Sequence, residues 1–407
     1  MRKAFGIALC ACVSLSLAGC AGSSSEAPRE STKQEESTAE SQTQEESVPE
    51  STKETVVKEM RDISSTELVK EMKIGWNLGN TLDSTSDNLD ITDTPASFEI
   101  AWGAQYTCQA QIDKVLEAGF NVIRIPVTWQ GHIHDDGKYT IEESWLNRVQ
   151  EVVDYAYNRG AFVILNTHHE DWYCPYYNTE EAAGEELKAI WTQIGERFKD
   201  YDEHLIFEGM NEPRQKGTSA EWTGNDEGRQ VINNLEKIFV KTIRELGGNN
   251  AKRHLMISGY AASSMDVNLK AIEVPEDDDK IIVSVHAYIP YNFALNNGNG
   301  AQSEWNNDTR DIDNLMKTIN ELFISKGTPV IIGEFGAMNR SNESERAQWA
   351  SYYVSAAKAI GVPCVWWDNH AFTGSGENFG LLVTNGLNFS WKYPELLDAM
   401  ITAADAK

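Results

Sequence analysis

The feature that most restricts the fold of this chain is a repeated alternation of short apolar runs with longer amphipathic stretches. Such a run, four to eight residues long and almost continuously apolar, is typical of a strand buried on both faces, as in a parallel sheet covered by helices. The eight runs are residues 74–79, 121–126, 162–167, 205–210, 254–259, 281–287, 329–334 and 363–368. The pattern therefore predicts a parallel α/β architecture.

The intervening stretches have the periodicity of helices. Residues 145–159, for example, place Leu146, Val149 and Val153 on one face and end before Gly160. The others are about 107–118, 184–198, 227–246, 309–326, 342–360 and 393–404, and the stretch at 264–273 has the weakest pattern. Eight strand–helix units predict a (β/α)₈ TIM barrel forming a single domain, with an open doubly wound sheet as the alternative. No Gly-x-Gly-x-x-Gly motif follows the first run, which disfavours a dinucleotide-binding sheet.

The charge balance excludes one class of partner. The 407 residues include 62 acidic and 35 basic side chains, for a formal net charge of −27. Such a surface repels phosphate backbones, so we expect no nucleic-acid partner. No stretch of about 18 apolar residues is present, so no segment has the length and composition of a membrane-spanning helix.

The first residues carry an export signal. Arg2 and Lys3 precede an apolar segment at 4–17, and residues 17–20 (LAGC) resemble a bacterial lipobox. We expect residues 1–19 to be a lipoprotein signal peptide and Cys20 to be lipidated, which would anchor the protein at the bacterial membrane surface. An ordinary signal peptide is the alternative.

Two further segments complete the predicted organisation. Residues 20–60 are rich in Ser, Thr and Glu and contain no aromatic residue, a composition that predicts a disordered linker. Residues 61–407 form the predicted folded domain. Its three widely spaced cysteines, Cys108, Cys174 and Cys364, exclude a disulfide-rich scaffold and a cysteine zinc site, although one pair remains open.

Polar side chains gather where the predicted strands end, and in a barrel all these ends meet at one mouth. Taken singly, each has a structural explanation: a buried ion pair for Arg124, or a loop or capping role for Glu212 and Glu334. Together with histidines and tryptophans they predict a functional site. The residues are Asn77, Arg124, Trp129, His168, His169, Glu170, Trp172, Tyr173, Glu208, Asn211, Glu212, His286, Tyr288, Glu334 and Trp367.

Two acids at one mouth, on the fourth and seventh strands, have the groups that glycoside hydrolysis needs: a proton donor for the leaving oxygen, and a nucleophile or base. Aromatic side chains suit the C–H faces of sugars. A metal-dependent hydrolase using His168, His169, Glu170 and His286 is the alternative, but its spacing does not match His-Glu-x-x-His.

Six segments, in order, carry a resemblance to a known family. They are 75–83 (GWNLGNTLD), 121–126 (NVIRIP), 206–213 (IFEGMNEP), 286–288 (HAY), 333–336 (GEFG) and 366–369 (WWDN). Together they resemble glycoside hydrolase family 5, in particular its subfamily 4 endoglucanases. The resemblance implies a retaining endo-β-1,4-glucanase (cellulase) that needs no cofactor or metal and acts on a β-glucan. The sequence does not reveal the oligomeric state, and a monomer is the default expectation.

The resemblance also implies roles for individual residues. Glu212 would be the acid/base and Glu334 the nucleophile, with their carboxyl groups about 5–5.5 Å apart. The supporting residues would be Arg124, His168, Asn211, His286 and Tyr288, and the substrate-binding residues Asn77, Trp129, His169, Trp172, Tyr173 and Trp367. We also expect the charge of Glu334 to raise the pKa of Glu212.

The preferred polysaccharide depends on the rim loops, which are 80–104, 130–143, 214–226, 291–308 and 369–392. Xyloglucanase, lichenase, mannanase and xylanase activities are alternatives on the same scaffold. A surface lipoprotein that binds glycans without cleaving them is the alternative from a different class.

Overall fold

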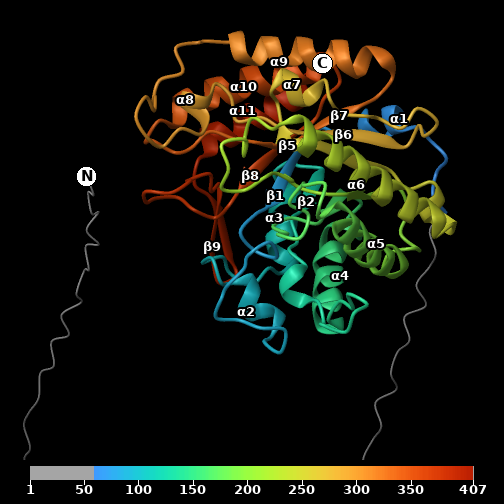
Figure 1. The fold of residues 1–407 in the computed structure, drawn as a ribbon. Helices are drawn as coiled ribbons and strands as arrows, with labels where there is room; N and C mark the ends of the chain where they lie inside the picture. Colours follow the sequence, from blue (N-terminus) through green and yellow to red (C-terminus); the bar gives the residue numbers. More distant parts are fainter. Residues whose placement is uncertain (1–58, 407) are drawn as a thin grey trace, which may run out of the picture. The chain divides into compact units, whose positions relative to one another are not determined.

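The computed structural model describes residues 59–406, and Figure 1 shows eight strands surrounded by helices. Each strand is parallel to the next, and β8 pairs with β1, so the sheet is closed. The strands are β1 (Ile74–Leu78), β2 (Val122–Ile125), β3 (Phe162–Asn166), β4 (Leu205–Glu208), β5 (Leu255–Ser263), β6 (Ile281–His286), β7 (Val330–Phe335) and β8 (Cys364–Asp368). All eight match predicted runs, which confirms the (β/α)₈ barrel.

The helices that cover the barrel follow the predicted pattern as well. They are α3 (Gln109–Glu117), α4 (Glu143–Tyr157), α5 (Glu180–Arg197), α6 (Asp226–Glu245), α9 (Arg310–Leu322), α10 (Glu343–Ala359) and α11 (Pro394–Asp405). The stretch with the weakest pattern forms only a single turn, α7 (Asp266–Leu269). Short 3-10 helices lie at Gln130–His132, Gly248–Ala251 and Ile324–Lys326.

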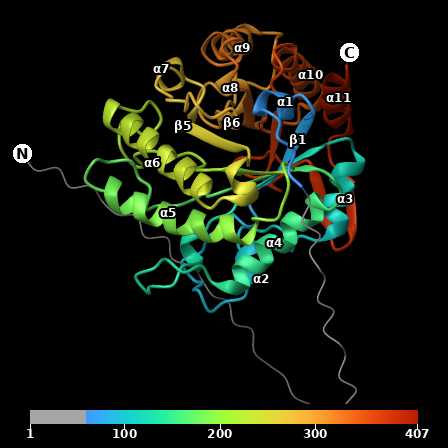
Figure 2. The same cartoon turned by 90° about the vertical axis from the view of Figure 1, so that its right-hand side faces the viewer.

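One end of the barrel is closed by apolar side chains. Helix α1 (Ser65–Val69), which begins at a Ser64 capping box, lies across this end (Figure 2). Its Leu68 and Val69 pack with inward-facing residues from the strands. These residues are Val122, Phe162, Ile164, Ile206, Met256, Ile282, Ile331 and Val365. The filled floor leaves the carboxyl ends of the strands as the mouth.

Towards the mouth, the inward positions become polar, because successive side chains of a strand alternate between its faces. Two residues after Val122, Ile206 and Ile282, the inward positions hold Arg124, Glu208 and Ser284. All three side chains are fully buried or nearly so. A buried polar layer of this kind must satisfy its own hydrogen bonds, which fixes its geometry.

A register shift on β7 determines where Glu334 lies. Val285 pairs with Ile332, whereas His286 pairs with Glu334, so Gly333 is an extra residue on β7. Such a bulge resets the alternation of side chains and re-aims the residue that follows. A Cβ at Gly333 would lie 3.0 Å from Ser284 Oγ and 3.2 Å from His286 Nε2. Glycine therefore allows Glu334 and His286 to share the mouth.

The rim loops contain structure that the sequence pattern did not predict. Helices α2 (Pro95–Glu99) and α8 (Tyr291–Ala294) and the antiparallel hairpin of β9 (Leu382–Asn385) and β10 (Asn388–Trp391) lie there. Cys108, Cys174 and Cys364 are all free thiols. Within residues 59–406, no helix is both long and apolar enough to span a bilayer. The predicted signal peptide, Cys20 and residues 20–58 of the predicted linker lie outside the described residues.

Candidate active site

Arg124 lies at the centre of the mouth and organises four side chains. Its guanidinium is fully buried and donates from Nε to Glu208 at 2.7 Å and from Nη1 to Glu334 at 2.7 Å. It also donates to the Oδ1 atoms of Asn77 at 2.9 Å and Asn211 at 2.8 Å. Burial opposes its charge, but the charges of Glu208 and Glu334 outweigh burial and raise the pKa of Arg124. The result is a rigid cationic centre.

The carboxylate of Glu334 is oriented through both oxygens. Oε1 accepts from Arg124, and Oε2 accepts from the hydroxyl of Tyr288 at 2.7 Å. Only 7% of the side chain is exposed. A carboxylate held in this way has little rotational freedom, so its accessible oxygen approaches a substrate from a fixed direction.

The carboxylate of Glu212 lies beside Glu334, four residues beyond the end of β4. His286 Nδ1 lies 2.8 Å from its Oε1 and 3.6 Å from Glu334 Oε2. Arg214 Nη1 lies 3.3 Å from Oε2 of Glu212. One ligating atom each from Glu212, His286 and Glu334 lie within 4.8 Å of one another. Oxygens of the two acids this close fit the short separation of carboxyl groups that a retaining mechanism needs.

The pKa of Glu212 differs in direction from our expectation. Burial alone would raise it, but the hydrogen bond and charge of His286, followed by the charge of Arg214, outweigh burial and lower it. Burial would lower the pKa of His286, but the charges of Glu334 and Glu212 and the Glu212 hydrogen bond raise it. The expectation from Glu334 alone was wrong because it left out these two cations. The lowered pKa of Glu212 and the raised pKa of His286 both favour an ion pair between the two side chains.

Replacing Arg214 with Gln should move the alkaline limb of the kcat/KM pH profile to higher pH. Arg214 lowers the pKa of Glu212, so its loss raises that pKa, and an acid with a higher pKa remains protonated to higher pH. The profile is measured on a soluble β-glucan. Arg229→Gln is the matched control, because Arg229 pairs with Asp226 and makes no contact with Glu212. An unchanged or lowered alkaline limb would contradict this role of Arg214.

Asn211 and His168 have defined hydrogen-bonding directions. Arg124 occupies Oδ1 of Asn211, so the Nδ2 group of Asn211 is free to donate. Asn166 accepts from Val127 through Oδ1 and donates through Nδ2 to His168 Nδ1 at 3.0 Å. Burial, with smaller effects of nearby cations, holds the pKa of His168 well below its usual value. The neutral ring therefore carries its proton on Nε2.

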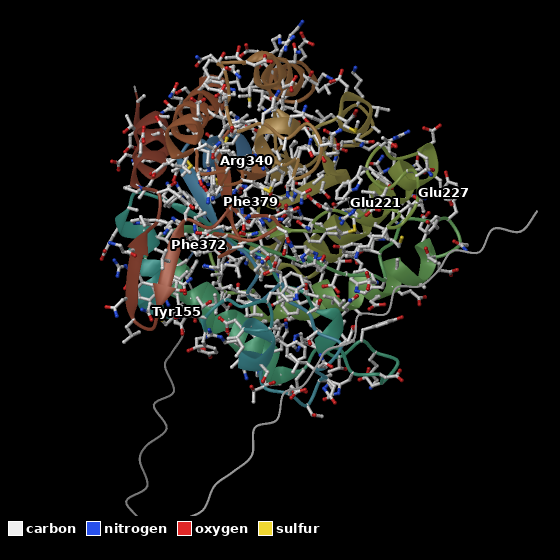
Figure 3. All side chains as sticks on the ribbon, turned by 90° about the vertical axis from the view of Figure 1, so that its left-hand side faces the viewer. Tyr155, Glu221, Glu227, Arg340, Phe372 and Phe379 are labelled. Atoms are coloured by element: carbon white, nitrogen blue, oxygen red, sulfur yellow. The ribbon has the colours of Figure 1, made fainter. Side chains whose placement is uncertain are left out.

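Trp367 lies on β8 and stacks on His168, with ring centroids 5.7 Å apart and planes 6° from parallel. Its side chain packs on Met338 and Phe379, and 7% of the residue is exposed. Figure 3 looks onto the mouth and places Phe379 on the same side as Phe372 and Arg340, across the face from Glu221. These contacts fix the ring of Trp367 at the edge of the polar layer.

Three of the residues that were predicted to bind substrate are buried in the structure. Asn77 and Trp129 are fully buried, and their side chains bond to protein groups: Asn77 to Arg124 and backbone carbonyls, and Trp129 to the carbonyl of Asn166. Tyr173 is 2% exposed and donates to the carbonyl of His168. The prediction of direct substrate contact was therefore wrong for Asn77 and Trp129, which support the site from below, and Tyr173 occupies a similar supporting position.

His169 and Trp172 are half-buried at the rim. Nε2 of His169 lies 3.8 Å from Asp83, and its ring packs against Trp102. Burial lowers the pKa of His169 to about 4, so the ring is neutral near pH 7. Trp172 donates to Glu170 at 2.9 Å, which directs its indole nitrogen away from solvent. Both residues retain exposed ring surface for a ligand.

The four residues of the metal-hydrolase alternative, His168, His169, Glu170 and His286, do not form one cluster of ligands among the described residues. Both oxygens of Glu170 accept from the backbone N–H groups of Trp129 and Gln130, and one also accepts from Trp172. His286 is bonded to Glu212. His168, His169 and Asp83 do lie close enough for an ion. However, the proton on Nε2 of His168 leaves that atom without a free lone pair.

Two contributors to the site had no role assigned from the sequence: Glu208, which was placed at the mouth only, and Arg214, which was not among the predicted residues. Glu208 bonds Arg124, and it also accepts from Ser284 at 2.6 Å and from Asn166 at 3.2 Å. Arg214 contacts Glu212. Both residues are close to Glu212 in the sequence, because Glu208 stands four residues before it and Arg214 two residues after it. Neither spacing indicates a contact until the strand register is known.

This arrangement defines a class of protein. A closed (β/α)₈ barrel with two adjacent carboxylates beyond β4 and on β7, one beside a histidine and the other beside an arginine and a tyrosine, has the machinery of a retaining glycoside hydrolase.

The family follows from comparison with known proteins. The model of the family "Cellulase (glycosyl hydrolase family 5)" matches residues 82–373, and the chain belongs to this family. Endoglucanase 1 of Ruminococcus albus is 51% identical over 344 residues, covering 84% of this chain and 82% of that protein.

Solved structures agree with this assignment. A broad-specificity endoglucanase of subfamily 4 from Ruminococcus champanellensis, with bound cellotriose, superposes with a TM-score of 0.81 at 48% identity and covers 84% of this chain and all of its own. A xyloglucan-specific endo-β-1,4-glucanase from a metagenomic library has a TM-score of 0.78 at 43% identity and covers 83% of this chain and 98% of its own. The prediction of glycoside hydrolase family 5 is confirmed.

Proposed function

We propose that this chain is a retaining endo-β-1,4-glucanase that hydrolyses cellulose-like β-glucans, with Glu334 as nucleophile and Glu212 as acid/base. The observation that carries the proposal is the pair of carboxylates within 4.8 Å, each oriented by its own set of partners. The relatives named endoglucanase support the reaction class. A binding protein without catalysis has no need of two adjacent acids.

In the first step, an oxygen of Glu334 attacks the anomeric carbon while Glu212 protonates the departing glycosidic oxygen. Arg124 and Tyr288 hold Glu334 in line for the attack. The Nδ2 group of Asn211 donates to the 2-hydroxyl of the sugar, a bond that strengthens as positive charge develops at the ring. Nε2–H of His168 donates to the sugar from the β3 side. The Trp367 ring supports a sugar face.

The proton for this step is held by the His286–Glu212 pair. We place it on His286 Nδ1 in the free protein, 2.8 Å from Glu212 Oε1, because the raised pKa of His286 and the lowered pKa of Glu212 favour this ion pair. A neutral sugar that displaces water from Glu212 strengthens desolvation, the effect that raises the pKa of this carboxyl. The proton then moves to Glu212 over one hydrogen bond. After the ester with Glu334 forms, Glu212 accepts a proton from water, and the water oxygen displaces Glu334.

The choice among β-linked backbones depends on the loops around the mouth. One structural relative is named for broad specificity and another for xyloglucan, so the scaffold admits unbranched and branched chains. We therefore place β-1,4-glucan first, with xyloglucan and mixed-linkage glucan as close alternatives and glucomannan and xylan as more distant ones.

We also propose that the enzyme is exported and held at the bacterial membrane surface through a lipidated Cys20, with residues 20–60 as the linker and the catalytic domain as a monomer. Support comes from the sequence of residues 1–60 alone. A linker of this composition would let the mouth reach an insoluble polysaccharide from the anchor.

The experiment that tests the function measures reducing ends released by residues 59–407 from a panel of polysaccharides. The panel contains carboxymethylcellulose, mixed-linkage β-glucan, xyloglucan, glucomannan and xylan. Release from the glucans with retained anomeric configuration is the expected result. A folded protein that releases nothing from any of them would favour the glycan-binding lipoprotein.

A further inference from the structure

The acid/base carboxyl is carried by a short segment, residues 209–213, that begins where β4 leaves the sheet. The N–H of Gly209 still donates to the carbonyl of Met256 on β5 at 3.0 Å, as in a regular ladder. The carbonyl of Gly209 instead accepts from two side chains, Thr167 Oγ1 at 2.8 Å and Trp191 Nε1 at 3.0 Å. The position of the residues that follow, the acid/base among them, therefore depends on side-chain contacts.

Ser258 on β5 makes the next of these contacts. Its buried hydroxyl donates at 3.0 Å to the carbonyl of Met210, which stands two residues before Glu212. Its backbone N–H lies beyond the end of the β4–β5 ladder and donates to Oε1 of Glu236 on α6 at 2.9 Å. Figure 2 shows α6 packed along β5. Glu236 thus replaces β4 as an acceptor for β5 and fixes Ser258.

Glu236 is buried, and only one of its oxygens is used. The residue is 3% exposed, and Oε2 has no hydrogen-bond partner in the part of the chain that the structure describes. A Cβ at Gly209 would lie 2.4 Å from Oε2, so the carboxyl packs directly on the acid/base segment. A charged carboxylate with a buried, unpartnered oxygen carries a desolvation cost that the uncharged acid avoids. Burial, together with the charge of Glu208 on β4, raises the pKa of Glu236 well above its usual value, against the opposing effect of the two Ser258 hydrogen bonds.

The Ser258 hydroxyl has one proton and two acceptors within reach. The carbonyl of Met210 lies at 3.0 Å and Oε1 of Glu236 at 3.3 Å. A charged carboxylate would attract this proton more strongly than a carbonyl does, whereas an uncharged acid leaves it with Met210. We propose that Glu236 is a positioning residue for the acid/base: as an uncharged acid it fixes Ser258, whose hydroxyl holds the Met210 carbonyl. The inference rests on the proposed function, in which Glu212 is the acid/base.

The test compares, in Ser258→Ala, a substrate that needs the acid with one that does not. Mixed-linkage β-glucan needs a proton on its leaving oxygen, whereas dinitrophenyl cellobioside leaves without one. We expect kcat/KM on the glucan to fall about tenfold, because a small displacement of Glu212 weakens proton transfer. The pre-steady-state burst of dinitrophenolate, which reports formation of the ester with Glu334, should stay within about twofold of wild type.

Substitutions of Glu236 separate its shape from its charge. Glu236→Gln keeps the shape and an oxygen that accepts from the N–H of Ser258, so both rates should stay within about threefold of wild type. Glu236→Ala removes the acceptor and should reproduce the selective loss on the glucan. Asn233→Ala is the matched control, because Asn233 is a buried polar residue of the same helix whose side chain bonds to Ala271 and Glu273. Its ratio of the two rates should equal the wild-type ratio.

The charge of Glu236 is tested by the pH dependence of stability. A glutamate in the unfolded chain loses its proton at about pH 4.3, whereas Glu236 keeps its proton in the folded protein. Above that pH the folded protein binds more protons than the unfolded chain, so this residue makes the free energy of unfolding fall as the pH rises. Glu236→Gln lacks this dependence. The thermal midpoint of Glu236→Gln minus that of wild type should therefore increase from about pH 5 to about pH 8.

Three results would overturn the proposal. Equal losses on both substrates in Ser258→Ala or Glu236→Ala would indicate a general structural role. Unchanged kinetics in Ser258→Ala would show that its hydroxyl does not position the acid/base. A midpoint difference that stays constant with pH would show that Glu236 is charged in the folded protein. A wild-type protein that cleaves neither substrate would instead refute the proposed function itself, so the two kinds of failure are distinguishable.

Discussion

Glu334→Gln should lower kcat on every β-glucan by at least about 10⁴-fold, as is typical when a nucleophile is removed. The amide is a poor nucleophile, so the ester intermediate does not form. The shape is conserved: Arg124 still donates to the amide oxygen, and Tyr288 lies beside the amide nitrogen. The expected loss is therefore in kcat, with little change in substrate binding. Initial rates on carboxymethylcellulose and binding of cellotetraose by calorimetry measure the two effects.

The control for this variant is structural. Glu334→Gln and wild type should have similar far-UV circular dichroism and thermal midpoints, so that an unfolded protein is not mistaken for an inactive one. Mass spectrometry of wild type treated with a 2-fluoro aryl cellobioside, which slows release of the intermediate, should locate the label on the peptide containing Glu334. A label on a different acid would disprove the nucleophile assignment.

The barrel was predictable because its strands and helices differ in apolar periodicity. The run at 281–287, for example, is apolar except for Ser284 and His286, as expected for a strand that is covered on both faces. The small elements of the rim were not predictable in this way. Helix α8 and the strands β9 and β10 are each four residues long, and an element of this length shows no measurable periodicity.

Residue identities at the mouth were predictable, but several roles were not. Glu212, Glu334 and Arg124 stand at strand ends, and strand ends converge in a barrel. The inward or outward direction of a side chain at a strand end depends on register, and the β6–β7 pair changes register at Gly333. Asn77 and Trp129 therefore seemed equivalent to Trp367 in the sequence, although only Trp367 retains exposed surface.

The direction of the Glu212 pKa depended on a contact that sequence spacing does not reveal. Like charges raise the pKa of an acid, and the expectation from the sequence took only the charge of Glu334 into account. The fold adds His286 from β6 and Arg214 from the following loop, and their effect on Glu212 is larger. The net shift of the Glu212 pKa depends on which charged side chains the fold brings beside it, so its direction can be determined only from the structure.

Glu212→Ala should affect substrates very unequally, and this selectivity is the second large effect we expect. Glucans with poor leaving groups should lose about 10²–10⁴-fold in kcat/KM, the usual contribution of general acid catalysis. A dinitrophenyl cellobioside leaves without a proton, so formation of its glycosyl ester with Glu334 should be nearly unaffected. The ester should then accumulate, because no base activates water. Pre-steady-state measurement of released dinitrophenolate should give a burst followed by slow turnover.

Azide should restore that slow turnover, because it is an anionic nucleophile and requires no base. The removed carboxylate leaves space between His286 and Arg214, both of which lay within 3.3 Å of it and favour an anion there. Attack on the ester forms the new C–N bond from the face that Glu212 served and expels Glu334, which gives the β-glycosyl azide. Glu334→Ala should instead give the α-azide, because azide then enters from the nucleophile's side. Since the two configurations arise from opposite faces of the sugar, exchanged products would reverse the two assignments.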